Sequence, residues 1–186
     1  MKFANFNNLI ELFYEICGSK NSNEIFLTSL KDKNNSYTWQ KTFECVQKFS
    51  EKLDDVLDKN ERCLLISENR PEWLISDIAI MLSKGVTVPA YTTYTKSDYE
   101  YLIDDCKPSV IIISNQQQFE KISEIIKKKN FIKLIISFDK IESGFKNQIT
   151  IDEIFEKKNF SSKKIENLNL KRSDLACIIY TSGTTG

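Results

Sequence analysis

The hydrophobic pattern of this 186-residue chain changes near residue 62. Before that point, apolar residues recur every three or four positions in two stretches, which is typical of helices that bury one face. The first predicted helix begins at a cap on Asn7 or Asn8 and ends near Gly18. The second follows an apolar stripe from Trp39 to Val56. Both stripes indicate packing surfaces rather than ligand sites.

Two short strands are predicted between these helices. The runs "EIFLTSL" and "SYTW" are rich in β-branched and aromatic residues, and the polar stretch "KDKNN" separates them as a turn would. Residues 1–61 are therefore expected to form N-terminal helices and a short hairpin. Residues 62–186 are expected to form a second unit built from βα repeats.

Short apolar runs alternate with helical patterns from residue 62 onward, which indicates βαβ units and a parallel sheet. Each run is apolar at almost every position, as expected when helices cover both faces of the sheet. The predicted fold class is therefore α/β, with a mostly parallel sheet between helices. The predicted strands are "CLLIS", "VTVPAY", "SVIIIS", "KLIISF" and "LACIIY", the last as an interior strand with exposed apolar surface.

Helix boundaries in this second region follow from capping residues. Pro71 suits the first turn of a helix that ends near Gly85, and Trp73 is expected to fill the core beneath it. Two further helices are predicted to begin at capping boxes, in which a hydroxyl residue and an acid three positions later satisfy each other's backbone N–H groups. The two pairs are Ser97 with Glu100 and Thr150 with Glu153.

The charge balance argues against nucleic acid as a partner. Lysine and arginine number 26 and aspartate and glutamate also number 26, so the chain has no net field to attract a polyanion. The basic run 127–129 ends a predicted helix, where cations stabilise the negative end of the helix dipole.

Five widely spaced cysteines and the absence of histidine argue against a disulfide framework and a zinc site. We expect reduced, mostly buried thiols. The amino-terminal residues do not resemble a signal peptide, and no stretch of about 18 apolar residues could span a membrane. A cytoplasmic location is expected, and peripheral membrane contact is left open.

The chain closes with a cluster of hydroxyl and glycine residues, "TSGTTG", directly behind the last predicted strand. Ligands of parallel α/β sheets bind beyond the carboxyl ends of strands, and glycine lets backbone N–H groups converge on an anion. The loop lacks the spacing and the lysine of a Walker A motif, and a chain without histidine cannot build a Ser-His-Asp triad. From the residues alone, an ordinary turn explains the cluster equally well.

A family resemblance favours the phosphate-binding interpretation. "IIYTSGTTG" resembles the start of the phosphate-binding signature of AMP-forming acyl-CoA synthetases and their adenylating relatives. "ENRPEW" and "VPAYTT" are most similar to the long-chain fatty-acid–CoA ligase branch, and "YTWQKTFECVQKFSEKL" fits an early helix of these enzymes. The resemblance thus spans nearly the whole chain.

The resemblance implies a role for the closing loop. Its residues would hold the β- and γ-phosphates of ATP while a fatty-acid carboxylate attacks the α-phosphorus, which gives acyl-adenylate and pyrophosphate before coenzyme A forms the thioester. No catalytic residue is expected in this chain, because the catalytic lysine and the Mg²⁺ ligands of the family lie in later segments. We therefore expect an N-terminal fragment that is inactive alone. The loop residues are Thr181, Ser182, Gly183, Thr184, Thr185 and Gly186.

Two other functions remain open at this point. One is a different adenylating enzyme, which would activate a short-chain, aryl or amino acid, and the other is a non-catalytic α/β binding module. The stretch 69–73 is interpreted as scaffold rather than catalytic machinery. Tyr91, Thr92 and Thr93 fit a cavity wall and a simple turn equally well.

Overall fold

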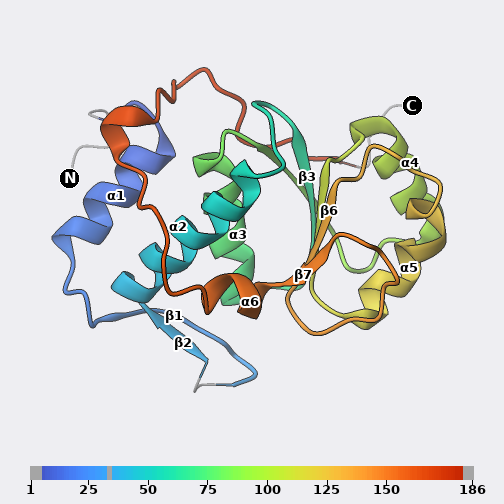
Figure 1. Cartoon of the computed structure of the whole chain (residues 1–186), viewed down its shortest axis with the longest axis horizontal. Helices are drawn as coiled ribbons and strands as arrows, with labels where there is room; N and C mark the ends of the chain where they lie inside the picture. The colour runs from blue at the N-terminus through green and yellow to red at the C-terminus, as the bar shows by residue number, and fades with distance from the viewer. Residues whose placement is uncertain (1–5, 33–34, 182–186) are drawn as a thin grey trace.

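A five-stranded parallel sheet forms the centre of the computed structural model, which describes residues 6–32 and 35–181 (Figure 1). The strand order is β4-β3-β5-β6-β7, and all four pairs are parallel. The predicted α/β class is confirmed. The strands are β3 (Arg62–Ile66), β4 (Val86–Ala90), β5 (Val110–Ile113), β6 (Leu134–Ser137) and β7 (Gln148–Thr150).

Helices cover both faces of this sheet, as predicted. Figure 1 shows α1, α2, α3 and α6 on one side and α4 and α5 on the other. The helices are α1 (Leu9–Ser19), α2 (Trp39–Asp54), α3 (Pro71–Leu82), α4 (Lys96–Cys106), α5 (Gln116–Ile126) and α6 (Ile151–Phe155), with a short 3₁₀ turn η2 (Ile165–Asn167). The predicted hairpin is present as β1 (Ile25–Thr28) and β2 (Ser36–Thr38), which pair antiparallel.

Alternate residues of each central strand enter two separate cores, because neighbouring side chains of a strand point to opposite faces. Leu65 and Ile112 pack with Phe49 of α2 in the first core, whereas Leu64 and Ile111 pack among α4 and α5 in the second. All five side chains are fully buried. The strands are therefore apolar at every position because each face has its own helical layer. The division of the chain at residues 61 and 62 stays a prediction.

The helix-start predictions were confirmed at three positions and wrong at one. Asn8, one of the two predicted residues, caps α1. Pro71 begins α3, and Thr150 and Glu153 form a capping box at α6. The box of α4 is formed by Thr95 and Asp98 instead of Ser97 and Glu100. The Asp98 carboxylate accepts from the backbone N–H of Thr95 at 2.8 Å, so the helix starts two residues earlier than predicted. Both pairs have the same spacing, and the sequence pattern alone did not distinguish them.

The prediction of an interior strand at "LACIIY" was wrong for the described structure. Residues 175–180 make one isolated parallel bridge, from Cys177 to Thr87 of β4. Because β4 is the edge of the sheet and no described strand lies on the far side, regular pairing does not extend. Leu175 and Ile179 are 53% and 64% exposed, which confirms the expected apolar surface.

Smaller differences concern strand β7 and the residues Gly18 and Trp73. Strand β7 was not predicted; it is three residues long, and all three residues are half-buried. Gly18 lies inside the last turn of α1, which is capped by Lys20. Trp73 is half-buried against the first core rather than filling it. These differences leave the arrangement of the sheet and its helices unchanged.

Candidate phosphate-binding site

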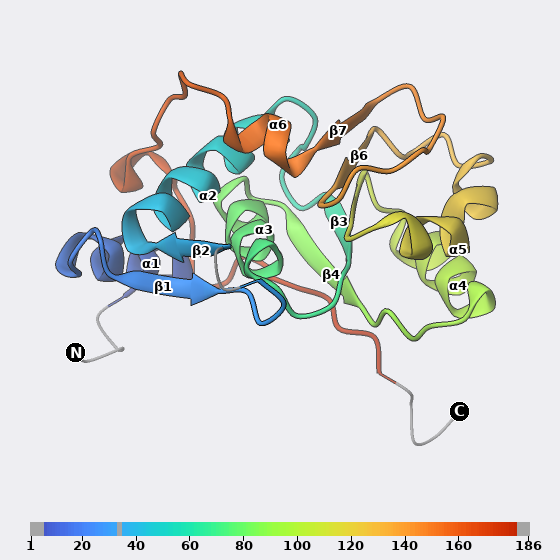
Figure 2. The same cartoon turned by 90° about the horizontal axis from the view of Figure 1, so that it is seen from below.

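The carboxyl ends of the parallel strands lie along one edge of the sheet, where ligands of such sheets bind. The residues that follow β3, β4, β5 and β6 therefore share this edge. Polar and aromatic groups occupy it, including Ser67, Tyr91, Asn115 and Asp139. The segment that leads into Thr181 runs parallel to β4 and reaches the same edge (Figure 2).

Two backbone hydrogen bonds attach this segment to β4. The N–H of Thr87 donates to the carbonyl of Ala176 at 3.1 Å, and the N–H of Ile178 donates to the carbonyl of Thr87 at 2.9 Å. Tyr180 then turns toward α4, where its hydroxyl donates to the carboxylate of Asp105. The chain is thus anchored on both sides immediately before the glycine-rich loop.

The titration of Tyr180 supports a donor role for its hydroxyl. Burial raises the pKa of Tyr180, and the hydrogen bond to the Asp105 carboxylate raises it further. The phenol therefore stays protonated at neutral pH and can keep this hydrogen bond. Its ring also makes an edge contact with Tyr101, with ring centroids 6.4 Å apart.

Most of the predicted loop lies outside the described residues. Ser182, Gly183, Thr184, Thr185 and Gly186 fall there, so their phosphate-binding role stays a prediction. Thr181 is described and is exposed at the end of the anchored segment. Its exposure leaves its hydroxyl accessible to a ligand.

A buried carboxylate at the start of α3 was missed by the sequence analysis. Glu72 is only 3% exposed. Its carboxylate accepts hydrogen bonds from Arg70 Nε at 2.8 Å, Asn35 Nδ2 at 3.0 Å and the Tyr37 hydroxyl at 3.1 Å. Arg70 also donates to Asp139, which follows β6, at 3.1 Å. The network joins the hairpin, α3 and β6 beside the carboxyl edge.

The charge of Glu72 is maintained by these partners. Burial alone raises the pKa of Glu72, but the hydrogen bonds from Arg70 and Asn35 outweigh it and leave the pKa below the usual value. Burial, with the nearby Glu72 charge, raises the pKa of Tyr37, which keeps the phenol protonated as a donor. In this network Glu72 and Arg70 form hydrogen bonds with other side chains of the protein. The network therefore supports the scaffold interpretation of residues 69–73. The apolar pattern around "RPEW" gave no sign that the acid would be buried.

The stretch that follows β4 forms a turn. The N–H of Tyr94 donates to the carbonyl of Tyr91 at 3.2 Å, which closes the turn. The Tyr99 hydroxyl donates to the same carbonyl at 2.7 Å, and Lys121 Nζ donates to the carbonyl of Thr92. These contacts favour the turn over the cavity wall for this stretch, since they hold its backbone carbonyls against α4 and α5.

A comparison with family models decides the class of this protein. The model of the AMP-binding enzyme family matches residues 15–186. The chain belongs to the AMP-binding enzyme family. Among curated members, it is 26% identical over 134 residues to the long-chain-fatty-acid–CoA ligase ACSBG1 of Bos taurus and 29% identical over 162 residues to long chain acyl-CoA synthetase 4 of Arabidopsis thaliana.

These AMP-binding relatives are much longer than the chain. The two alignments cover 70% and 80% of the chain but only 18% and 23% of the relatives. The chain therefore spans about a fifth of the length of the curated relatives that it matches.

Solved structures of adenylate-forming enzymes share the fold. The anthranilate CoA ligase AuaEII, in complex with anthranoyl-AMP, matches with a TM-score of 0.77 at 18% identity. The match covers 100% of the present chain and 35% of the ligase chain. The luciferase-like enzyme of the mealworm Zophobas morio matches with a TM-score of 0.75 at 19% identity. This match covers 100% of the present chain and 42% of the mealworm enzyme. At these identities the likeness establishes the architecture alone.

No group of three or more histidine, cysteine, aspartate or glutamate side chains within 6–32 and 35–181 is arranged to hold a metal ion. Among the helices of those ranges, none is both long enough and apolar enough to cross a membrane.

Proposed function

We propose that this chain is the amino-terminal part of an ATP-dependent, AMP-forming long-chain fatty-acid–CoA ligase. The proposal rests above all on the family match over residues 15–186, which ends in the sequence "TSGTTG". The two curated relatives named above, both long-chain acyl-CoA synthetases, support the choice of a long-chain acid.

In this proposal the loop 181–186 binds the β- and γ-phosphates of ATP. Backbone N–H groups freed by Gly183 and Gly186, together with the threonine and serine hydroxyls, stabilise the negative charge that develops on departing pyrophosphate. The segment just before the loop positions the start of the loop, because the backbone groups of Ala176 and Ile178 are hydrogen-bonded to Thr87 of β4. The described part of the site therefore acts as a rigid support for the loop.

Other functions of the ligase belong to segments outside this chain. The Mg²⁺ ligands, the catalytic lysine and the coenzyme A site are proposed to lie there, so the 186-residue chain alone is expected to form no acyl-adenylate. A cytoplasmic location, with peripheral membrane contact left open, and the boundary between residues 61 and 62 are also part of the proposal.

A ligase for short-chain, aryl or amino acids is the main alternative. The likeness to the anthranilate CoA ligase concerns the fold alone and does not favour an aryl acid. A non-catalytic binding module is disfavoured because the family match extends over almost the whole chain.

Variants of the loop test the proposal in the complete protein. Thr184→Ala should slow fatty-acid-dependent ATP–pyrophosphate exchange by about 10²- to 10³-fold, the usual effect of losing one donor to a developing anion. Gly183→Val should be more severe, because a β-branched side chain resists positive φ and would crowd the phosphates. Thioester formation from synthetic acyl-adenylate should be largely spared, since no polyphosphate remains to be held.

Thr93→Ala provides a matched control, because Thr93 is an exposed threonine in the turn at the same sheet edge. It should leave both half-reactions unchanged. Equal losses in both half-reactions for Thr184→Ala, with an unchanged circular dichroism spectrum, would contradict the proposed role in pyrophosphate departure.

A further inference from the structure

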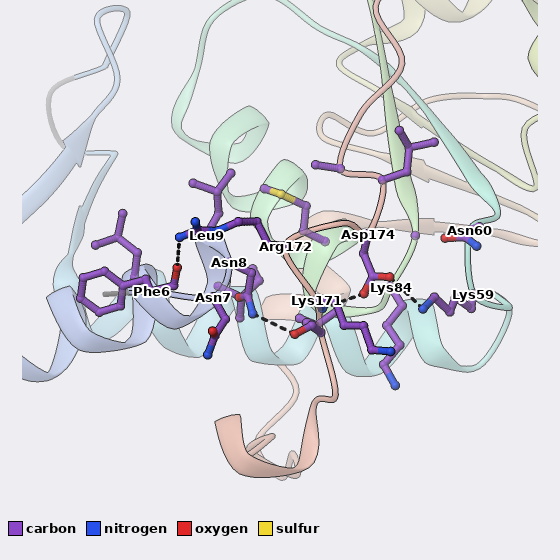
Figure 3. Close-up of a pocket in the computed structure, with 17 residues that line it drawn as sticks. Phe6, Asn7, Asn8, Leu9, Lys59, Asn60, Lys84, Lys171, Arg172 and Asp174 are labelled. Atoms are coloured by element: carbon purple, nitrogen blue, oxygen red, sulfur yellow. Dashed lines mark hydrogen bonds and ion pairs between the residues drawn. The ribbon is translucent and has the colours of Figure 1, made fainter. Parts of the chain in front are cut away.

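A cavity of about 380 Å³ lies at the opposite, amino edge of the sheet (Figure 3). It opens between the start of α1, the end of α3 and the segment 170–176, just before β3 and β4 begin. Its apolar lining comes from Phe6, Leu9, Leu12, Met81, Leu170 and Leu175. Because strands of five residues span roughly 15 Å, the cavity is well separated from the candidate phosphate site.

Hydrogen bonds between distant parts of the chain hold the walls of this cavity. Arg172 Nη2 donates to the carbonyl of Phe6 at 2.6 Å, and Asn8 Nδ2 donates to the carbonyl of Leu170 at 3.2 Å. Figure 3 shows both bonds joining the start of α1 to the segment 170–176. The cavity is thus a feature of the folded chain rather than a gap between unattached segments.

The charges around the opening are unbalanced. Four cations and one acid line the cavity. Lys59 and Asp174 form an ion pair at 3.0 Å and neutralise each other. The other three cations, Lys84, Lys171 and Arg172, take part in no ion pair with an acid among residues 6–32 and 35–181. Figure 3 shows the Arg172 guanidinium beside Phe6, away from the side-chain ends of Lys84 and Lys171.

Large apolar side chains stand exposed beside these cations. Leu9 and Leu175 both line the cavity and are 60% and 53% exposed. Exposed leucines of this kind are poorly hydrated, and burying them against an apolar ligand would be favourable. The opening therefore combines unpaired positive charge with accessible apolar surface.

We propose that this cavity binds the anionic head and single apolar chain of a free fatty acid. The alkyl chain would occupy the apolar interior, and the carboxylate would pair with Lys84 and Lys171 at the opening. A volume near the lower end of the ~300–1,000 Å³ range of ligand pockets suits one acyl chain better than a two-chain phospholipid. The carboxylate supplies the negative partner that Lys84 and Lys171 lack among the described residues.

This cavity lies at the edge of the sheet opposite Thr181, where the proposed phosphate site begins. Its occupation needs neither ATP nor the loop 181–186. The inference therefore stands whether or not the chain belongs to a long-chain ligase.

Binding of the fluorescent fatty acid cis-parinaric acid to the full chain, without ATP or coenzyme A, tests the proposal. We expect the probe to bind saturably. Laurate should displace it, whereas the uncharged methyl laurate should not. The double variant Lys84→Glu/Lys171→Glu should weaken binding by roughly tenfold or more, because it replaces attraction for the carboxylate by repulsion. The matched control Lys128→Glu reverses an exposed lysine after α5 and should bind as the parent does.

A second variant separates loss of the site from loss of the fold. Ala176→Phe adds volume to the cavity lining without changing its charge, so it should reduce binding of the probe while the urea midpoint stays near that of the parent. Three results would each overturn the proposal. They are probe binding that rises linearly without saturation, displacement of the probe by methyl laurate as effective as that by laurate, and unchanged affinity in the folded charge-reversal variant. Because no nucleotide is present, none of these results depends on adenylation.

Discussion

Replacing Glu72 by glutamine is expected to destabilise the fold strongly. The carboxylate is 3% exposed and accepts hydrogen bonds from Arg70, Asn35 and Tyr37. Glutamine has similar shape but no charge, and one of its two terminal atoms is a donor where the carboxylate has two acceptors. The Glu72→Gln variant therefore leaves the half-buried Arg70 without its nearest counter-charge.

The size of the effect follows from the burial of this pair. Breaking a buried ion pair by removing one partner costs about 3–5 kcal/mol, because the remaining charge is left uncompensated. Arg70 keeps its ion pair with the partly exposed Asp139, so we expect the lower end of this range, about 3 kcal/mol. That is a large fraction of the ~5–15 kcal/mol that stabilises a typical domain.

Urea unfolding followed by tryptophan fluorescence measures this loss. Trp73 is adjacent to Glu72, and Trp39 begins α2 directly after the hairpin that the network holds. The matched control is Glu124→Gln, because Glu124 forms an ion pair with Lys127 in which both side chains are largely exposed. Exposed ion pairs contribute little to stability, so this control should unfold near the parent midpoint. Equal midpoints for the two variants would refute the reasoning.

The same variant should change how stability depends on pH. The pKa of Glu72 is lowered in the folded protein, so its contribution is complete above the unfolded pKa of about 4.3 and is lost as the pH falls toward the folded pKa. The parent should lose stability in this acidic window more steeply than Glu72→Gln. Parallel acid-unfolding profiles for the two proteins would contradict the lowered pKa.

Three further predictions follow from single positions. Cys177 is exposed whereas burial raises the pKa of Cys45 to about 12, so Ellman's reagent should label Cys177 in the native protein and Cys45 only after unfolding; equal rates would contradict this burial pattern. A Cβ at Gly85 would lie 3.1 Å from Ile80 Cγ2, so Gly85→Val should lower the free energy of unfolding by about 1–3 kcal/mol, and an unchanged urea midpoint would show that the neighbours yield freely. Thr150→Ala removes the cap of α6 and should cost about 1 kcal/mol, measured against Thr150→Ser, which keeps the hydroxyl and should be nearly neutral.

The sheet could be predicted because its signal is local and redundant. The run "VIII" at residues 110–113 is apolar at every position, which is typical of a strand covered on both faces. Pro71 and Thr150 marked helix starts by chemistry that needs no tertiary contact. The start of α4 was wrong because two capping pairs of equal spacing overlap, and their competition depends on backbone geometry.

The network around Glu72 could not be predicted for a different reason. Its members Asn35 and Tyr37 lie more than thirty residues from Glu72 in sequence, and their meeting depends on how the hairpin packs on α3. The cavity at the amino edge is equally non-local, since it combines the start of α1 with the segment 170–176. The glycine-rich loop, by contrast, was found by its sequence alone, and its proposed role rests on family membership.

Fatty-acid-dependent ATP–pyrophosphate exchange by the complete protein tests the proposed adenylation most directly. We expect exchange with long-chain fatty acids, conversion to acyl-CoA when coenzyme A is added, and no exchange by the 186-residue chain alone. Exchange that requires an amino acid or an aryl acid, or its absence with every carboxylate tried, would contradict the proposed long-chain fatty-acid–CoA ligase.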